Sequence, residues 1–307
     1  MSFVDEKILI FDGACGTNLQ EMVIPEAAWQ GCAGCNELLN LTAPETIIAL
    51  HKSFLDAGAM VVETNTFGAS SIVLAEYDLA AKTAEINHAA VANARAAIDG
   101  RSGCYVAGSV GPTTKLPSLG HISVDALAQS LGEQFRALVE AGVDALVIET
   151  CQDLLQVKTA IVACYDALEQ AGRDMPVLVS VTMERQGTML VGSDIAAICA
   201  TLEPFPIFSL GLNCATGPAD MASHIRYLGH NWPGRISCMP NQGLPEVVDG
   251  KTFYPMTPDE FARHMRMFVE HDGVSIVGGC CGSTPEHIRR LAEGCRMLVP
   301  ARREVLT

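Results

Sequence analysis

The chain has 307 residues, of which 49% are hydrophobic, and its formal net charge is -15 at pH 7. This acidic balance argues against nucleic acid and anionic membrane as partners, because phosphate binding needs clustered lysine and arginine. The sequence has no uninterrupted apolar window of about 18 residues and no basic, cleavable leader at its start. We therefore expect a soluble cytoplasmic protein.

Strands are predicted by short apolar runs, which alternate with longer amphipathic segments. The runs mostly lack the polar alternation of a half-exposed sheet, and this is typical of strands buried on both faces of a parallel sheet. They cover residues 8–11, 60–64, 105–109, 145–148, 177–181, 207–212, 236–239 and 274–277.

Helices are predicted in the longer segments, and several have clear start signals. Serine or threonine at the cap, proline in the first turn and acidic residues soon after favour a helix N-terminus. The signals are Thr42-Ala43-Pro44-Glu45 before a helix to Ala57, Ser123 before 126–141, Thr257 before 261–271, and Ser283-Thr284-Pro285-Glu286 before 287–297.

Eight strand–helix units of about 38 residues predict a single-domain (β/α)8 barrel, a TIM barrel, over residues 1–307. The alternative is an open, doubly wound sheet, which would carry a glycine-rich dinucleotide turn after an early strand. Residues 12–17 are the nearest candidate and do not fit that pattern. Two long connections, 14–42 and 240–256, are expected as loops at the C-terminal face of the barrel, where binding usually takes place.

Three cysteines follow predicted strands: Cys214 after the sixth, and the adjacent Cys280 and Cys281 after the eighth. Because all strands of such a barrel open onto one face, these residues are expected to converge. Three thiolates suit a soft or borderline ion, with zinc the default, and leave a fourth position for water or substrate. A thiol substrate in that position would be held as a nucleophilic thiolate.

The glycines around the pair fit this interpretation, since Gly278, Gly279 and Gly282 would let the backbone aim two successive side chains at one ion. Two other interpretations stay open, namely two buried inert thiols or a strained disulfide between Cys280 and Cys281. Most of the twelve cysteines are expected to be reduced and to act as small buried hydrophobic residues.

Cys32 and Cys35 form a C-x-x-C pattern, which a redox pair or half of a second zinc site would use. The pattern lacks a helix start and a second pair, so we favour neither role.

Several separate motifs then occur in a characteristic order. They are Asp12-Gly13-Ala14-x-Gly16-Thr17, Glu63-Thr64-Asn65-Thr66-Phe67, Gly108-Ser109-Val110-Gly111-Pro112, Glu149-Thr150, Gly211-Leu212-Asn213-Cys214 and Gly278-Gly279-Cys280-Cys281-Gly282. With them the chain resembles the homocysteine S-methyltransferase family over residues 7–297. Residues 240–245 and 281–288 make it most similar to the N-terminal homocysteine-binding module of the family's cobalamin-dependent methionine synthases.

The resemblance implies an S-methyltransferase that moves a methyl group to the sulfur of homocysteine, giving methionine, with Zn2+ as cofactor. It implies zinc ligation, and catalysis through zinc, by Cys214, Cys280 and Cys281. It implies contacts to the amino-acid end of homocysteine, with Glu149 as the partner of the ammonium group, from Asp12, Gly13, Asn65, Glu149 and Asn213.

The methyl donor is less well specified by the sequence. We expect a methylcorrinoid (cobalamin) on another module or protein, docked transiently on the barrel face, because no segment resembles a corrinoid-binding module. One alternative is a small donor, S-methylmethionine or betaine, used without a corrinoid. Another is a non-catalytic thiol- or metal-binding module. Cys15 occupies a position where related proteins often carry methionine, and its role is left open.

Overall fold

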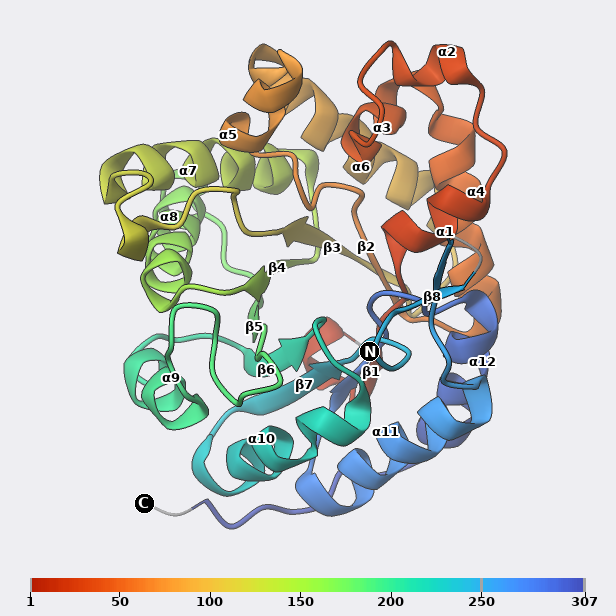
Figure 1. The fold of residues 1–307 in the computed structure, drawn as a ribbon, viewed down its shortest axis with the longest axis vertical. Coiled ribbons are helices and arrows are strands. Elements are labelled where there is room, and N and C mark those ends of the chain that lie inside the picture. Colours follow the sequence, from red (N-terminus) through yellow and green to blue (C-terminus); the bar gives the residue numbers. More distant parts are fainter. Residues whose placement is uncertain (1, 249–250, 306–307) are drawn as a thin grey trace.

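A closed ring of parallel strands forms the centre of the molecule in the computed structural model, which describes residues 2–248 and 251–305. The strands lie in the order β1-β10-β7-β6-β5-β4-β3-β2, and a parallel bridge between Phe11 and Val61 joins the two ends. Figure 1 shows helices surrounding this ring. The predicted (β/α)8 barrel is confirmed. Its strands are β1 Leu9–Ile10, β2 Val61–Glu63, β3 Tyr105–Val110, β4 Ala145–Cys151, β5 Val177–Val181, β6 Ser209–Asn213, β7 Arg235–Met239 and β10 Ile276–Val277.

The larger helices alternate with the strands, as predicted. They are α4 Pro44–Ala57, α6 Thr83–Ile98, α7 Val124–Ala141, α8 Leu154–Ala171, α9 Ile195–Leu202, α10 Pro218–Asn231, α11 Pro258–Asp272 and α12 Pro285–Cys295. Among the described residues, no helix combines the length and apolar character that a membrane crossing requires.

The predicted caps are correct at Ser123 and Thr257, whose side chains accept hydrogen bonds from backbone amides in the first turns of α7 and α11. At Thr284 the His287 side chain takes part in the cap: His287 Nδ1 accepts from the Thr284 amide at 3.2 Å and lies 2.9 Å from its hydroxyl. The prediction is wrong at Thr42. This residue ends the short helix α3 Leu39–Thr42 and donates to the Leu38 carbonyl, so Ala43 occupies the cap of α4.

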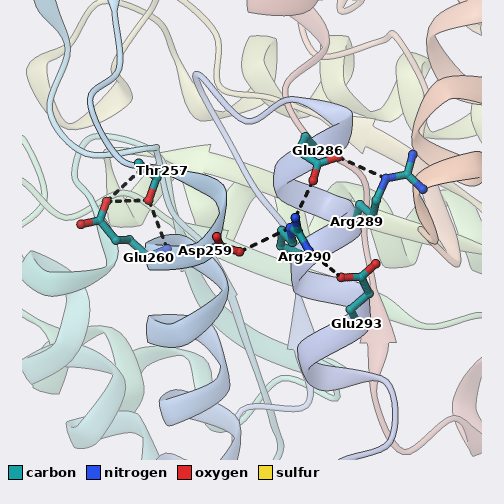
Figure 2. Close-up of polar contacts among 7 residues, drawn as sticks. All are labelled: Thr257, Asp259, Glu260, Glu286, Arg289, Arg290 and Glu293. Atoms are coloured by element: carbon teal, nitrogen blue, oxygen red, sulfur yellow. Dashed lines mark hydrogen bonds and ion pairs between the residues drawn. The ribbon is translucent and has the colours of Figure 1, made fainter.

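Surface charges join α11 to α12 (Figure 2). Arg290 of α12 lies 3.3 Å from Asp259 of α11 and 3.1 Å from Glu286 of its own helix. These side chains are between 45% and 83% exposed, so solvent screens each pair and its contribution to stability is small. The pairs belong to the outer helical layer.

The barrel interior changes from apolar to polar along the strands. Alternation places Val61, Ala107, Val147 and Leu178 inside, in one apolar cluster. Two residues further along the same strands, the same face carries a polar side chain. These are Glu63, Ser109, Glu149 and Ser180. The C-terminal mouth of the barrel is thus lined by groups that hydrogen bond and ionise.

The two long connections differ from the predicted loops. Residues 14–42 contain α1 Cys15–Glu21, α2 Glu26–Trp29 and α3, and residues 240–256 contain an antiparallel pair, β8 Glu246–Val248 and β9 Lys251–Phe253. Residues 249 and 250, within the second connection, lie outside the described residues. The remaining short elements are α5 Ser71–Leu74 and 3-10 turns at Phe3–Asp5, Asn36–Leu38, Ala75–Tyr77, Ala80–Lys82 and Pro117–Leu119.

Candidate metal and substrate site

The three predicted ligand cysteines converge at the barrel mouth. The sulfur atoms of Cys214, Cys280 and Cys281 all lie within 4.8 Å of one another, and those of Cys214 and Cys281 are 3.9 Å apart. A tetrahedral zinc ion with Zn–S bonds of about 2.3 Å separates its sulfur ligands by about 3.8 Å. The group therefore has the dimensions of a three-thiolate zinc site. All twelve cysteines are free thiols, so Cys280 and Cys281 are not joined as a disulfide.

Backbone hydrogen bonds between loops hold these cysteines in place. The Cys280 amide donates to the Pro240 carbonyl (2.9 Å), and the Cys281 amide donates to Asn241 Oδ1 (3.0 Å). Cys214 adopts a left-handed conformation with φ 62°, which costs a residue with a side chain about 1–2 kcal/mol. The loops after β6, β7 and β10 thus fix the direction of the three thiols.

The glycines beside the cysteines act differently from the prediction. Gly282 has φ 80° and packs against the Tyr254 ring. Its backbone therefore adopts the left-handed conformation that glycine favours, as expected. Gly278 and Gly279 do not have positive φ values. A Cβ at Gly278 would lie 2.8 Å from Phe11 Cβ, and one at Gly279 would lie 2.5 Å from Ser283 Oγ. These two residues are small because neighbouring segments approach them closely.

Contact among the thiols makes them unequal as acids. Hydrogen bonds from Cys214 and Cys280 lower the pKa of Cys281 to about 3. Interactions with Cys214 and Cys281, together with burial, raise the pKa of Cys280 well above its ordinary value. One of the three sulfurs is therefore stabilised as a thiolate by its neighbours.

A cavity of about 340 Å³ opens beside the cysteines. Its lining includes the acidic residues Asp12, Glu37, Glu63 and Glu149, and none of the described residues that line it is a lysine, arginine or histidine. The strand ends and the residue 12–17 loop thus form a small acidic pocket next to the thiols.

Glu149 is held at both oxygens by neighbouring side chains. Ser109 donates to Oε1 at 2.5 Å, while Thr150 and Asn213 donate to Oε2 at 3.2 Å each. Burial raises the pKa of Glu149, and the hydrogen bonds oppose this shift. The carboxyl group is therefore fixed in position at the end of β4.

Asn213 completes its hydrogen bonds within the protein. Its Nδ2 donates to Glu149 and to the Thr150 hydroxyl, and its Oδ1 accepts from the Thr150 amide and the Ser180 hydroxyl. A side-chain amide has two donor hydrogens and two acceptor sites, so these contacts use its full capacity. The observed bonds make Asn213 a positioning residue for Glu149, and direct substrate contact stays a prediction.

Asp12 and Gly13, in the loop after β1, line the same cavity. Asp12 is buried, its Oδ2 accepts from the Glu63 amide at 3.2 Å, and its Oδ1 has no partner among the described residues. Burial raises the pKa of Asp12 well above its ordinary value. At Gly13 a Cβ would lie 2.7 Å from Ser283 Oγ and 2.8 Å from Phe54, so only glycine fits there.

Asn65 lines the cavity and is tied to Cys15, whose thiol donates to Asn65 Oδ1 at 3.4 Å. Asn65 Nδ2 donates to the Asn36 carbonyl at 2.8 Å. Cys15 also lines the cavity but is not a member of the three-cysteine group. Burial raises the pKa of its thiol, which keeps it protonated. Cys32 and Cys35 are likewise free and outside that group.

Glu63 also lines the pocket, although it is not among the predicted substrate contacts. Its Oε1 is buried without a hydrogen-bond partner among the described residues, and burial raises its pKa well above the ordinary value. A signal was present, because Glu63 lies two residues after Val61 and alternation directs both side chains into the barrel.

A polar pocket at the C-terminal mouth of a (β/α)8 barrel is the usual location of an active site in this fold. The family model for homocysteine S-methyltransferase matches residues 9–295, and the chain belongs to this family. The predicted enzyme class, an S-methyltransferase acting on homocysteine, agrees with this membership.

Relatives were found among both sequences and structures. The chain is 43% identical over 291 residues to methionine synthase from Mycobacterium leprae and 40% identical over 309 residues to that from Mycobacterium tuberculosis. These matches cover 94% and 99% of this chain but only 24% and 26% of the relatives, so the chain spans about a quarter of their length. The metallated form of the homocysteine methyltransferase MmuM from Escherichia coli is similar in fold, with a TM-score of 0.74, 23% identity, and coverage of 94% of this chain and 96% of that one.

Proposed function

We propose that the chain is a homocysteine-binding barrel that transfers a methyl group from a methylcorrinoid, carried by another module or protein, to homocysteine, giving methionine. The observation that carries this proposal is the three-cysteine group opening onto a small acidic cavity. The sequence relatives named methionine synthase support it, since they align with nearly the whole chain.

Cys214, Cys280 and Cys281 are the proposed ligands of a zinc ion. The distance of 3.9 Å between two of the sulfurs and the all-thiol donor set fit this ion. Zinc held by three thiolates supplies an open coordination position that favours ionisation of a substrate thiol. The protein contributes the fixed direction of the three thiols, which follows from the loop hydrogen bonds around Cys280 and Cys281.

The acidic wall is the proposed site for the amino-acid end of homocysteine. Glu149, held by Ser109 and Asn213, and Asp12, with its unpartnered Oδ1, present carboxyl oxygens to the α-ammonium group. Gly13 lines the cavity with its backbone, because Ser283 and Phe54 occupy the space that a side chain would need. Fixing this end aligns the sulfur for in-line attack, which needs no acid from the protein.

The reaction balances without a further reactant. The methyl carbon forms a bond to the homocysteine sulfur while its bond to the donor breaks. The bonding electron pair stays with the donor, and the proton of the substrate thiol leaves to solvent.

A donor that docks from outside is favoured by the surface around the mouth. Segments that follow barrel strands lie on this face, and they carry exposed apolar residues. These are Phe67, Leu119, Leu190, Val247 and Phe253, each between 42% and 79% exposed. A contiguous patch of such groups would suit the docking of another protein or module. The cavity, at about 340 Å³, has the size for an amino acid and leaves a corrinoid outside.

The proposal is tested by incubating the zinc-loaded chain with homocysteine and, in parallel, methylcobalamin, a methylated corrinoid protein, S-methylmethionine or betaine. Methionine is expected with the corrinoid donors. Methionine formed with a small donor alone would show that this donor, and not a corrinoid, supplies the methyl group. Homocysteine binding without turnover by any donor would instead establish a non-catalytic binding module.

A further inference from the structure

Two carboxyl oxygens at the cavity are buried without a hydrogen-bond partner among the described residues. They are Asp12 Oδ1 and Glu63 Oε1. Asp12 is only 4% exposed, and both residues line the pocket. A buried polar atom without a partner costs free energy, commonly 1–3 kcal/mol, unless a ligand or water satisfies it. The two oxygens therefore indicate a ligand that donates hydrogen bonds.

The described lining of this cavity carries acidic side chains without a positive partner. Asp12, Glu63 and Glu149 face the cavity, and no lysine, arginine or histidine is among the described residues that line it. Their mutual repulsion adds to burial in disfavouring the charged forms of Asp12 and Glu63. A cation that enters the pocket removes part of this penalty, because it offsets the charges and supplies donors.

Glu63 lies next to the Asp12 carboxyl. It ends β2, and its backbone amide donates to Asp12 Oδ2 at 3.2 Å, so the two acidic residues are held together. An alkylammonium group has three N–H donors and no acceptor. Asp12, Glu63 and Glu149 offer one carboxyl group for each of these hydrogens.

We propose that Glu63 is a third carboxyl ligand of the substrate's α-ammonium group and selects thiols that carry a free primary amine. This inference rests on the proposed function, since it takes homocysteine as the bound thiol. It adds a specificity-determining residue at the end of β2 to the predicted contacts. Thiols of the same length without the amine leave the Glu63 and Asp12 oxygens unpartnered and bind less tightly.

The test is a calorimetric titration of the zinc-loaded full chain with homocysteine and with γ-mercaptobutyrate, which is homocysteine without its amine. Glu63→Gln keeps the side-chain volume and removes the charge. Homocysteine affinity is expected to fall about 10- to 100-fold in this variant, the scale of one charged hydrogen bond. The affinity for γ-mercaptobutyrate is expected to stay unchanged, so the preference for the amine falls by the same factor.

Glu37→Gln is the matched control. Glu37 lines the same cavity, but its Oε1 already accepts the Gly68 amide at 2.7 Å. Its replacement should leave the ratio of the two affinities unchanged. Zinc content and the melting temperature verify that each variant is folded. If Glu63→Gln does not fold, Glu63→Asp takes its place and should also weaken homocysteine binding selectively.

Equal losses for both thiols in the Glu63 variant would show a purely structural role and overturn the inference. Unchanged homocysteine affinity would overturn it as well. Failure of the proposed function looks different, because the unmodified zinc-loaded chain would then bind neither thiol.

Discussion

The sulfur atoms of Cys214 and Cys281 lie 3.9 Å apart although 67 positions separate the two residues in the chain. Closure of the barrel brings the loops after β6 and β10 together, and hydrogen bonds from the intervening residue 240–242 loop fix them. A metal site assembled in this way depends on the fold and on each thiol. Its loss is therefore expected to be measurable one cysteine at a time.

Replacing Cys281 by alanine should abolish stoichiometric zinc binding, because two thiolates and a void do not complete the ligand set. Metal analysis after dialysis against a weak chelator measures this. Cys15→Ala is the matched control, since Cys15 lines the same cavity outside the cysteine group. One tightly bound zinc ion in Cys281→Ala, or its loss from Cys15→Ala, would refute the ligand assignment.

Gly282→Ala should weaken zinc binding as well as stability. The new methyl group would collide with the Tyr254 ring, and φ 80° is itself strained for alanine by about 1–2 kcal/mol. Gly142→Ala has a comparable φ of 88° with no atom within 4 Å of its Cβ, so it reports the strain alone. Chelator competition and thermal melting separate the two effects. Equal behaviour of both variants in the chelator assay would speak against coupling between Tyr254 packing and the metal site.

Glu149→Gln should weaken homocysteine binding by about 1–3 kcal/mol, the scale of a hydrogen bond to a charged group. Asn213→Ala should also weaken it, because Asn213 positions Glu149. The double variant should lose less than the sum, with a coupling energy of about 0.5–3 kcal/mol. Calorimetry measures the homocysteine dissociation constant of the zinc-loaded unmodified chain, of both single variants and of the double variant. An unchanged dissociation constant in Glu149→Gln would remove this residue from the site.

His51 is predicted to make the barrel sensitive to acid. Burial lowers its pKa to about 4 from 6.5, so the folded chain binds fewer protons than the unfolded chain between these values. The stability that neutral His51 contributes is present above pH 6.5 and is lost as the pH falls toward 4. The total loss in the free energy of unfolding is about 3 kcal/mol.

Urea unfolding at pH 7 and near pH 4 checks this, with His51→Gln losing less stability on acidification than the unmodified chain. His121→Gln, on an exposed loop, is the control. The same acid loss in His51→Gln as in the unmodified chain would contradict the assignment.

The barrel and the convergence of the cysteines were predictable because both follow from periodicity and order. Eight apolar runs predict eight strands, and the position of Cys214 at a strand end then fixes which face it occupies. Asp12 and Glu149 also follow predicted strands, so the sequence places them on the same face.

Other features depend on contacts that lie far apart in sequence. The reason that Gly278 and Gly279 have no side chain is packing against Phe11 and Ser283, which no local pattern reports. The β8–β9 pair was not predicted, although Asp249-Gly250 with Val248 before it and Thr252 shortly after it is a hairpin signal in the sequence. The motif around Glu63 does not indicate its place in the pocket, whereas strand alternation does.

The central claim is that an open position on a three-cysteine zinc site receives the sulfur of homocysteine. X-ray absorption at the zinc edge of the loaded chain tests it most directly, with and without homocysteine. We predict three sulfur ligands and one lighter atom without substrate, and four sulfur ligands with it. Four sulfur ligands before homocysteine is added, or no change on its addition, would contradict the account.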